Sequence, residues 1–299
     1  MLAGGRSSRM GTSKAALEWH GSTLLRRTVG IISRVTGGPV VVVRAPGQAL
    51  PALPPHIEVV DDPREGLGPV QGLAAGLAAV ADRAEIAFVS STDLPFLHPA
   101  FVRRVLRAML DGADVGLPLV RGYPQPLAAS YRTALAPVAE RLAAQHRLRP
   151  AFLFEACTVA RLGEDALRAD PVLAALDPEL DSVVNINEPA DYQAARERPA
   201  PEVMIQRSGS LAGGGRGPRL VRAATVAGAA SAAGLQFGGP AVAVLNGGQV
   251  RAEQVTGGQG PDGQVVMDGQ VVTDGQTPLV TGDTVFFRSA DRAPDPQPV

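Results

Sequence analysis

The sequence predicts an α/β protein, in which a mostly parallel sheet is covered by helices over about the first 195 residues. Short apolar runs bounded by Gly and Pro alternate there with segments of helical periodicity. Polar motifs follow the ends of these runs, and parallel sheets of this class bind ligands at the carboxyl ends of their strands. Beyond about residue 200 the chain becomes Gly-rich with short Val runs, which indicates a second, smaller domain.

Three apolar runs are the expected strands of the first domain. The run at 38–46 carries four consecutive valines between Gly-Pro and Ala-Pro, a pattern typical of a strand buried on both faces. The runs at 56–62 and 84–92 are expected to form further strands, and the segments at 68–83 and 98–112 have the spacing of helices. This alternation favours right-handed strand–helix–strand units and hence parallel pairing.

The bulk composition narrows the class of protein. Hydrophobic residues make up 45% of the 299 residues, enough for a globular core, and the formal net charge of -1 gives no reason to expect nucleic acid or an anionic membrane as a partner. A single cysteine, Cys157, excludes an internal disulfide framework and is interpreted as a small buried hydrophobe. No apolar run approaches the about 20 residues that span a bilayer and no signal pattern opens the chain, so we expect a cytoplasmic protein.

The opening segment, MLAGGRSSRMGTSKAAL, has the composition of a phosphate-binding loop. Gly4 and Gly5 allow backbone N–H groups to approach an anion closely, and Lys14 is the only lysine of the chain. Neither the Walker pattern nor the G-x-G-x-x-G fingerprint is present. Taken alone, the segment is equally consistent with a flexible start and a solvated lysine.

The full string LAGGRSSRMGTSKAAL resembles the signature of the molybdenum cofactor guanylyltransferase (MobA-like) family. Related cytidylyltransferases typically carry Leu-Ala-Ala-Gly, so Gly4-Gly5 favours guanine. Four further segments resemble the family's motifs in the expected order: DDPREGLGPVQGL (61–73), SSTDLPFL (90–97), YPQPLAASYR (123–132) and VVNINEPADY (183–192). The resemblance implies a Rossmann-like nucleotidyltransferase fold for residues 1–198.

The same resemblance implies an enzyme that transfers GMP from Mg-GTP to molybdopterin and releases pyrophosphate. Its cofactor would be Mg²⁺, its substrates GTP and molybdopterin, and its protein partners molybdoenzymes or other proteins of cofactor biosynthesis. Use of CTP, use of a sugar phosphate as acceptor, and a catalytically idle binding or scaffold protein remain alternatives. Mg-dependent GTP binding with pyrophosphate release would separate the enzyme from the scaffold.

Specific residues follow from the matched motifs and from the chemistry. Nucleotidyl transfer concentrates negative charge, so it calls for cations and a metal ligand at the strand ends. Asp93 directly follows the apolar strand at 84–92, where it could hold Mg²⁺, although a helix N-cap is the other interpretation. The expected catalytic residues are Lys14, Asp93 and Arg9. The expected nucleotide-binding residues are Leu2, Ala3, Gly4, Gly5, Lys14, Asp61 and Asp93. The expected metal ligands are Asp93 and Asn187.

Several of these assignments leave alternatives open. Asp61 matches the family position near base or ribose, and Asp62 would replace it if the loop shifted by one residue. Asn185 and Asn187 could face the metal or the acceptor phosphate, or could be turn residues before Pro189.

The sequence also departs from the family pattern. Met1 directly abuts Leu2, so the strand that normally precedes Leu-Ala-Gly-Gly is almost wholly missing. Because that strand lies in the middle of the sheet, its loss is expected to expose apolar faces and to orphan backbone groups. Either the true start lies upstream or this form is compromised. Arg44 stands where the family often carries Asn, so no contact is assigned to it, and Ser91 or Thr92 takes the place of a common Cys.

Residues 199–290 weakly resemble the β-grasp, ubiquitin-like sulfur carriers of the thiamin and molybdopterin pathways. The order of the segments 202–207, 219–235, 241–250 and 277–287 carries this resemblance. Sulfur carriers work through a C-terminal Gly-Gly, whereas this chain ends in DPQPV, so carrier chemistry is not expected. Asp-Gly-Gln recurs three times between 262 and 276, which suggests a turn-rich insertion, and the Pro-rich residues 291–299 are expected to be a disordered tail.

Overall fold

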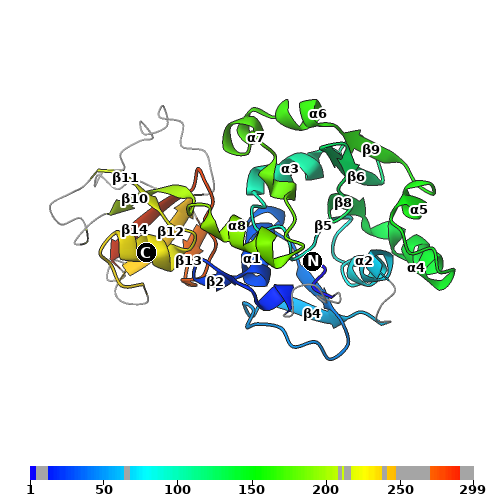
Figure 1. Cartoon of the computed structure of the whole chain (residues 1–299), viewed down its shortest axis with the longest axis horizontal. Helices are drawn as coiled ribbons and strands as arrows, with labels where there is room; N and C mark the ends of the chain where they lie inside the picture. Colours follow the sequence, from blue (N-terminus) through cyan, green and yellow to red (C-terminus); the bar gives the residue numbers. More distant parts are fainter. Residues whose placement is uncertain are drawn as a thin grey trace, which may run out of the picture. The chain divides into compact units, whose positions relative to one another are not determined.

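The computed structural model describes residues 1–4, 13–63, 68–207, 211, 217–237, 241–246 and 270–289. The chain divides into two compact units, Met1–Arg198 and Pro199–Val299 (Figure 1).

The first unit alternates strands with helices along the chain. Its strands are β1 (Glu18–Trp19), β2 (Ser22–Thr23), β3 (Val40–Arg44), β4 (Ile57–Asp61), β5 (Ile86–Ser90), β6 (Val115–Val120), β7 (Tyr123–Pro124), β8 (Ala128–Arg132) and β9 (Val159–Leu162). Its α-helices are α1 (Leu24–Thr36), α2 (Gly68–Ala78), α3 (Pro99–Arg107), α4 (Ala136–Ala144), α5 (Ala151–Phe154), α6 (Glu164–Arg168), α7 (Pro171–Leu176) and α8 (Pro189–Glu197). Three short 3₁₀ turns are η1 (Lys14–Ala16), η2 (Thr133–Leu135) and η3 (Asp181–Val183). The strands and helices expected at 38–46, 56–62, 68–83, 84–92 and 98–112 are all confirmed.

The sheet of the first unit consists of two parts that the chain's first residues join. β3 and β4 pair in parallel, whereas β5, β8 and β6 form the second part, with β9 parallel to β6. Leu2 makes parallel bridges to Val43 on one side and to Ser91 on the other. Among the described strands of this joined sheet, β8 and the short β7 alone oppose the direction of the others, so the predicted mostly parallel sheet is confirmed. The short β1 and β2 form a separate antiparallel pair.

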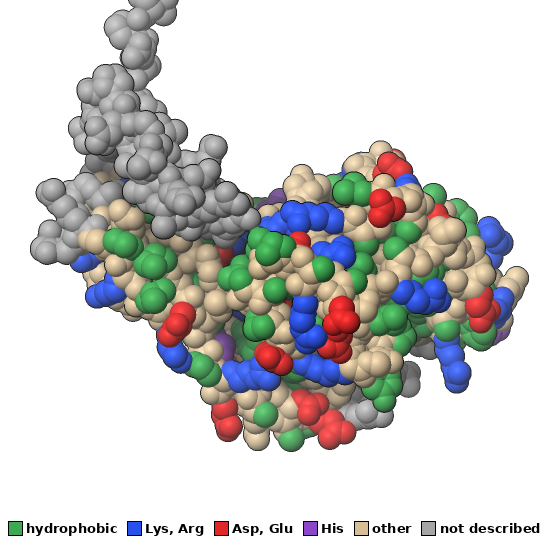
Figure 2. All heavy atoms as spheres, turned by 90° about the horizontal axis from the view of Figure 1, so that it is seen from above, with side chains coloured by type: hydrophobic (Ala, Val, Ile, Leu, Met, Phe, Trp, Pro, Cys, Tyr) green, Lys and Arg blue, Asp and Glu red, His purple; other side chains and the backbone are tan. Residues whose placement is uncertain are grey.

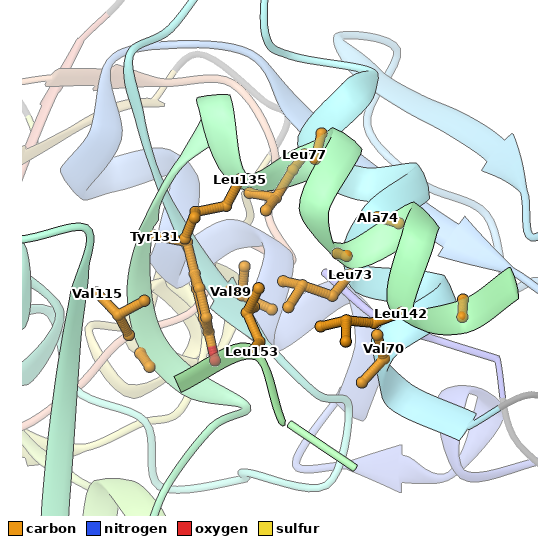
Figure 3. Packing of buried hydrophobic residues seen from close by; sticks show 14 of the residues in the cluster. Val70, Leu73, Ala74, Leu77, Val89, Val115, Tyr131, Leu135, Leu142 and Leu153 are labelled. Carbon is orange, nitrogen blue, oxygen red and sulfur yellow. The ribbon is translucent and has the colours of Figure 1, made fainter. Parts of the chain in front are cut away.

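Helices cover both faces of this sheet, as two neighbouring residues of β8 show. Tyr131 is fully buried in a core cluster with α2 and α4, and its hydroxyl donates to the Pro126 carbonyl at 2.7 Å. Ser130 points to the other face and donates to the Val105 carbonyl of α3 at 3.1 Å. In Figure 3, Leu73 and Leu77 of α2, Leu142 of α4 and Val89 of β5 pack around Tyr131. Alternation along each strand thus makes two cores, one on each side.

Local sequence signals place the helix ends that border the site. The Thr23 hydroxyl accepts from the Arg26 N–H at the start of α1, which ends where Gly37 adopts a left-handed φ of 61°. Pro99 occupies the first turn of α3, and the His98 ring nitrogen accepts from the Ala100 N–H. These caps fix where the loops between strand and helix begin.

The second unit is a mixed β-sheet with one helix. Its elements are β10 (Glu202–Arg207), β11 (Arg219–Arg222), α9 (Val226–Ala232), β12 (Ala241–Asn246), β13 (Gln270–Val272) and β14 (Thr284–Ser289). The strand order is β11-β10-β14-β12-β13, with β10 parallel to β14 and every other pair antiparallel. Val226, Ala229 and Ala230 of α9 pack on Val203 and Phe287 in a separate core. A β-rich second unit is therefore present.

Some of the features expected from the sequence lie in residues that the structure does not describe. The Asp-Gly-Gln copy at 262–264, the first two residues of the copy at 268–270 and the tail 291–299 lie outside the described residues. The third copy is described, and there the Asp274 side chain accepts from the Gln276 N–H at 2.9 Å in a turn.

The surface mixes charges of both signs. In the view of Figure 2, arginine and lysine side chains are interspersed with aspartate and glutamate rather than gathered into one field. Among the helices of the described ranges, none combines the length and apolar character needed to cross a membrane.

Candidate active site

Three of the predicted site residues meet at the carboxyl end of β5. The Lys14 ammonium lies 3.3 Å from Asp93 Oδ2 and 3.4 Å from Asn187 Oδ1. Asp93 lies 79 positions after Lys14 in the sequence, and Asn187 lies 173 positions after Lys14, so only the fold brings the three residues together. The Lys14 and Asp93 side chains are 19% and 18% exposed, which leaves them accessible to a ligand at the surface. The structure thus gathers a cation, a carboxylate and an amide oxygen at one point.

Backbone and side-chain bonds hold Asp93 in place. It follows β5 by three residues, and its carbonyl accepts from the Ile186 N–H at 3.0 Å. Its Oδ1 accepts a short hydrogen bond from the hydroxyl of Ser91, which is itself buried. The two carboxylate oxygens therefore have different partners, Ser91 on one side and Lys14 on the other. Asp93 makes no N-cap bond to α3, where His98 has that role.

Asn187 is positioned from two directions. Ile186, directly before it, is fully buried against Trp19 and Leu24 and so anchors the segment that enters α8. The Asp191 carboxylate accepts from the N–H groups of Asn187 and Glu188, each at 2.9 Å. The hydrogen bond from the Asn187 N–H lowers the pKa of Asp191, helped by the Glu188 N–H and the charge of Lys14. Sequence reasoning missed Asp191, although an acidic residue in the first turn of a helix is a recognisable capping signal.

The first four residues form a strand end between β3 and β5. The Ala3 N–H donates to the Val43 carbonyl at 2.8 Å, and the Leu2 N–H donates to the Ser90 carbonyl at 2.7 Å. A Cβ on Gly4 would lie 3.1 Å from the backbone nitrogen of Ala45, so the chain at the end of β3 leaves little room for a side chain there. This supports the idea that glycine is required by close backbone packing at this position.

Gln48 links this strand end to the segment that carries Lys14 and to the turn after β3. Its amide nitrogen donates to the Ala3 carbonyl at 3.0 Å and to the Ser13 hydroxyl at 3.5 Å, while its oxygen accepts from the Ala45 N–H. Ser13 directly precedes Lys14, so Gln48 ties the lysine segment to the start of the chain. Sequence reasoning missed Gln48, because nothing in the turn after β3 distinguishes it from an ordinary surface glutamine.

Asp61 lies at the end of β4 and is paired with Arg44, a residue for which no role was expected. The strands β3 and β4 place Arg44 and Asp61 in register, and Arg44 Nε donates to Asp61 Oδ1 at 2.7 Å. Arg44 also donates to the Gln48 carbonyl at 3.2 Å. Asp62, the alternative to Asp61, turns elsewhere, since its Oδ2 would lie 3.8 Å from a Cβ placed on Gly72 of α2. An arc of these residues therefore runs from Asp61 through Gln48 to Lys14 and Asp93.

The remaining predicted residues stand apart from this arc. Gly5 and Arg9 lie outside the described residues. The Asn185 side chain donates to the Val183 carbonyl at 3.3 Å, as a turn residue would. Cys157 is half-buried, and burial raises the pKa of its thiol to about 11, which keeps it protonated at neutral pH and argues against a nucleophile.

The site offers only part of a metal coordination shell. No group of three or more His, Cys, Asp or Glu side chains that could hold a metal occurs in the described part of the chain. Asp93 and Asn187 supply one carboxylate and one amide oxygen around Lys14. Such a set fits Mg²⁺, which commonly takes one or two carboxylates and completes its shell with water and substrate phosphates.

Comparison with known proteins decides the family. A family model described as the MobA-like NTP transferase domain matches residues 1–159, which is more than half of the chain. The chain belongs to this family. The predicted resemblance and the prediction of a nucleotidyltransferase enzyme are thereby confirmed.

Individual relatives agree with this family. Two proteins named "probable molybdenum cofactor guanylyltransferase" are similar to this chain: one from Mycobacterium tuberculosis, 38% identical over 166 residues that cover 54% of this chain and 81% of the relative, and one from Mycobacterium avium, 37% identical over 148 residues that cover 48% and 73%. The crystal structure of molybdopterin-guanine dinucleotide biosynthesis protein A from Archaeoglobus fulgidus matches with a TM-score of 0.52 and 24% identity, over 66% of this chain and 95% of that one. The last match supports the Rossmann-like fold of the first unit.

Proposed function

We propose that the first unit transfers GMP from Mg-GTP to molybdopterin and releases pyrophosphate. The observation that carries this proposal is the meeting of Lys14, Asp93 and Asn187 at the carboxyl end of β5. The names of the mycobacterial relatives support the choice of nucleotide and acceptor. The backbone of Leu2, Ala3 and Gly4 borders the same strand ends, where open α/β sheets bind nucleotides.

The chemistry of the transfer matches the charges of the site. Attack by the acceptor phosphate on the α-phosphate builds negative charge on the transferred group and on the leaving pyrophosphate. The Lys14 ammonium, a compact point charge with three donors, neutralises part of this charge and orients the triphosphate. Bound Mg²⁺ would neutralise the remainder, with Asp93 and Asn187 as its protein ligands. Because these two oxygens make an incomplete shell, the metal is expected to bind together with the nucleotide.

Asp61 is the proposed reader of the guanine base. Its carboxylate already accepts from a nitrogen donor, Arg44 Nε at 2.7 Å, and its side chain is 52% exposed. Guanine presents two neighbouring donors, N1–H and N2–H₂, that a carboxylate can accept together, whereas adenine and cytosine lack this pair. We therefore expect GTP to be preferred over CTP and ATP by at least about tenfold, or about 1.4 kcal/mol.

The test measures pyrophosphate release with molybdopterin as acceptor, with GTP, CTP and ATP in turn, with and without Mg²⁺. Release that requires Mg²⁺ and is fastest with GTP supports the proposal. CTP as the best substrate would indicate a cytidylyltransferase, and a sugar phosphate as the better acceptor would overturn the molybdopterin assignment. The absence of nucleotide binding would indicate a scaffold.

A base swap separates base recognition from ribose binding. Xanthine carries a carbonyl where guanine carries the N2 amine, so Asp61→Asn should lose GTP and gain XTP as a substrate. Asp62→Asn is the matched control, since its side chain turns toward α2, and it should keep the preference for GTP. Equal loss of both nucleotides in Asp61→Asn would point to a ribose contact.

We further propose that residues 199–290 form a β-grasp-like domain that takes no part in nucleotide binding. Parallel pairing of its first and last strands at the centre of the sheet, with the helix after the second strand, supports this fold. All the described candidates for phosphate, base and metal contact precede Arg198. Calorimetry with Mg-GTP should therefore give the same affinity, within about threefold, for the full chain and for a fragment of residues 1–198. A loss of tenfold or more in the fragment would contradict the proposal.

A further inference from the structure

A small apolar cluster, separate from the core around Tyr131, contains the only tryptophan of the chain. Trp19 comes from the β1–β2 hairpin and is 3% exposed. We call this group the tryptophan cluster. Its buried members are Trp19, Leu24, Ile186 and Ala195, and the partly buried side chains that pack against them are Leu17, Phe96 and Tyr192.

The tryptophan cluster receives one side chain from each of the three segments that form the candidate site. These side chains are Leu17, three positions after Lys14; Phe96, three positions after Asp93; and Ile186, directly before Asn187. The three segments therefore meet twice, once through polar atoms at the site and once through apolar side chains in the cluster. The packing of the cluster thus bears on how the polar atoms are arranged.

Trp19 packs on both segments that carry the expected metal ligands. Its ring meets the Phe96 ring edge to face, with 5.6 Å between the centroids and 80° between the planes, a favoured geometry for aromatic pairs. It also packs on Ile186, which is fully buried. The Ile186 N–H donates to the Asp93 carbonyl at 3.0 Å, so the two segments are joined directly beside the tryptophan.

The backbone around Trp19 is itself held on both sides. The Tyr192 hydroxyl of α8 donates to the Glu18 carbonyl at 2.6 Å, directly before the tryptophan. The Leu24 N–H at the start of α1 donates to the Leu17 carbonyl at 3.0 Å. Because protein cores are close-packed, a ring fixed in this way restricts the movement of the side chains that it contacts.

We propose that Trp19 is a positioning residue, whose ring holds the Asp93 and Asn187 segments at the separation that lets both side-chain oxygens reach one cation. The proposal rests on the proposed function, in which that cation is Mg²⁺ bound with the nucleotide. Trp19 acts through Phe96 and Ile186 and not by contact with the metal. Misplacement of a reacting group by about 1 Å can cost about 10²-fold in rate, so a small shift of either segment should be measurable.

The first test compares the loss of two buried aromatic rings. Trp19→Leu removes the ring from the tryptophan cluster, and Tyr131→Leu removes a fully buried ring near the amino end of β5, where Tyr131 pairs with Ala87. Both should lower Tm, by about 5 °C. Trp19→Leu alone should raise the Mg²⁺ concentration for half-maximal pyrophosphate release, at least about tenfold, whereas Trp19→Phe, which keeps a ring, should stay within about threefold of the parent chain.

Two results would overturn the proposal: no rise of the Mg²⁺ requirement in Trp19→Leu, or an equal rise in Tyr131→Leu. Phe96→Leu is the second variant if Trp19→Leu does not fold, because the half-buried Phe96 is the ring through which Trp19 contacts the Asp93 segment. It should raise the Mg²⁺ requirement in the same way. An unchanged requirement in Phe96→Leu would equally overturn the proposal.

The second test needs no nucleotide and so separates this inference from the proposed function. Amide hydrogen exchange at Ile186 reports how often its bond to the Asp93 carbonyl opens. Trp19→Leu should speed this exchange at least about tenfold, and Tyr131→Leu should change it less than about threefold. If the parent chain releases no pyrophosphate with any nucleotide, the proposed function fails, but exchange at Ile186 still decides the role of Trp19. Unchanged exchange in Trp19→Leu would overturn that role even in an active enzyme.

Discussion

The two ends of the gap between β3 and β5 differ in almost every physical respect. At the carboxyl end, Leu2, Ala3 and Gly4 fill the gap, and their backbone groups bond to Val43 and Ser90 on both sides. At the amino end the gap is an apolar cavity with a buried ammonium at its mouth. Within the part of the chain that the structure describes, Lys14, Asp93 and Asn187 gather beside the first end.

The difference shows that the residues of the candidate site and the residues that determine stability can lie at opposite ends of the same strands. The Lys14, Asp93 and Asn187 cluster depends on the end of β5, on the segment that enters α8 and on Gln48, none of which requires the lower half of the gap. The cavity bears instead on stability, because it removes packing partners from both cores. We therefore expect changes at the carboxyl end to alter activity and changes at the amino end to alter stability.

The largest effect is expected from Asp93→Asn. The substitution preserves shape and the backbone bond from Ile186 but removes the negative charge that would hold the metal beside Lys14. Pyrophosphate release in Mg²⁺ should fall at least about 10³-fold, whereas Tm should change by less than about 2 °C. Asp82→Asn, at a side chain that is 81% exposed, is the matched control and should keep full activity. Activity within about tenfold of the parent chain would remove the metal role of Asp93.

The second effect belongs to the amino end and depends on pH. The Met1 ammonium has a pKa of about 5 in the folded chain and an ordinary value of 8.0 when exposed, so the unfolded chain binds more protons between these values. The free energy of unfolding should therefore rise with pH from about 5 to about 8, by up to about 4 kcal/mol, and should level off above 8. Urea unfolding at pH 5, 6, 7 and 8 measures this slope.

The same chain acetylated at its N-terminus is the control for that slope. Acetylation removes the titrating amine but leaves His20, whose pKa is also lowered by burial, and the carboxylates unchanged. The difference in unfolding free energy between the two chains should shrink as pH rises from 5 to 8. Parallel curves for the two chains would show that the Met1 amine is not buried as the structure places it.

The third effect tests Lys14 as a point charge. Its ammonium sits between Asp93 Oδ2 and Asn187 Oδ1 at 3.3 and 3.4 Å, a position that a planar guanidinium cannot share in the same way. Lys14→Arg should weaken Mg-GTP binding about tenfold, or about 1.4 kcal/mol, by calorimetry. Arg141→Lys, an exposed cation exchange in α4, should leave the affinity unchanged. Unchanged affinity in Lys14→Arg would show that charge alone suffices at this position.

How much the sequence could predict depends on whether a contact is local. The strands at 38–46, 56–62 and 84–92 follow from apolar runs, and the position of Asp93 follows from the end of the last run. The Arg44–Asp61 pair could not be read from sequence, because it depends on the register of two parallel strands. Gln48 joins Ala3 to Ser13 only in the folded chain, since its partners lie 45 and 35 residues away. The expectation that the short first strand exposes apolar faces is wrong, because Met1, Val41 and Phe88 are only 8%, 5% and 6% exposed.

The smallest effect is expected at Ser91, which directly follows β5 at the carboxyl end. Its backbone bridges Leu2, and its buried hydroxyl donates to Asp93 Oδ1, the oxygen that Lys14 does not hold. Without this bond Asp93 keeps its charge but loses one restraint on its orientation, a change of about 0.5–1 kcal/mol. Ser91→Ala should therefore raise the Mg²⁺ concentration for half-maximal activity about threefold and leave Tm nearly unchanged, whereas Ser91→Thr, which retains a hydroxyl, should restore it.

The neighbouring serine provides the comparison that decides the cause. Ser90 is also buried, but its hydroxyl donates to the Ser91 carbonyl at 3.1 Å and not to a carboxylate. Ser90→Ala should therefore lower Tm slightly, by about 1–3 °C, without changing the Mg²⁺ requirement. If both alanine variants raise the Mg²⁺ requirement alike, the effect comes from general loosening of the strand end. If only Ser91→Ala raises the Mg²⁺ requirement, the Ser91 hydroxyl orients the metal ligand Asp93. Side-chain hydrogen bonds of this kind then distinguish the carboxyl end of the gap from its amino end.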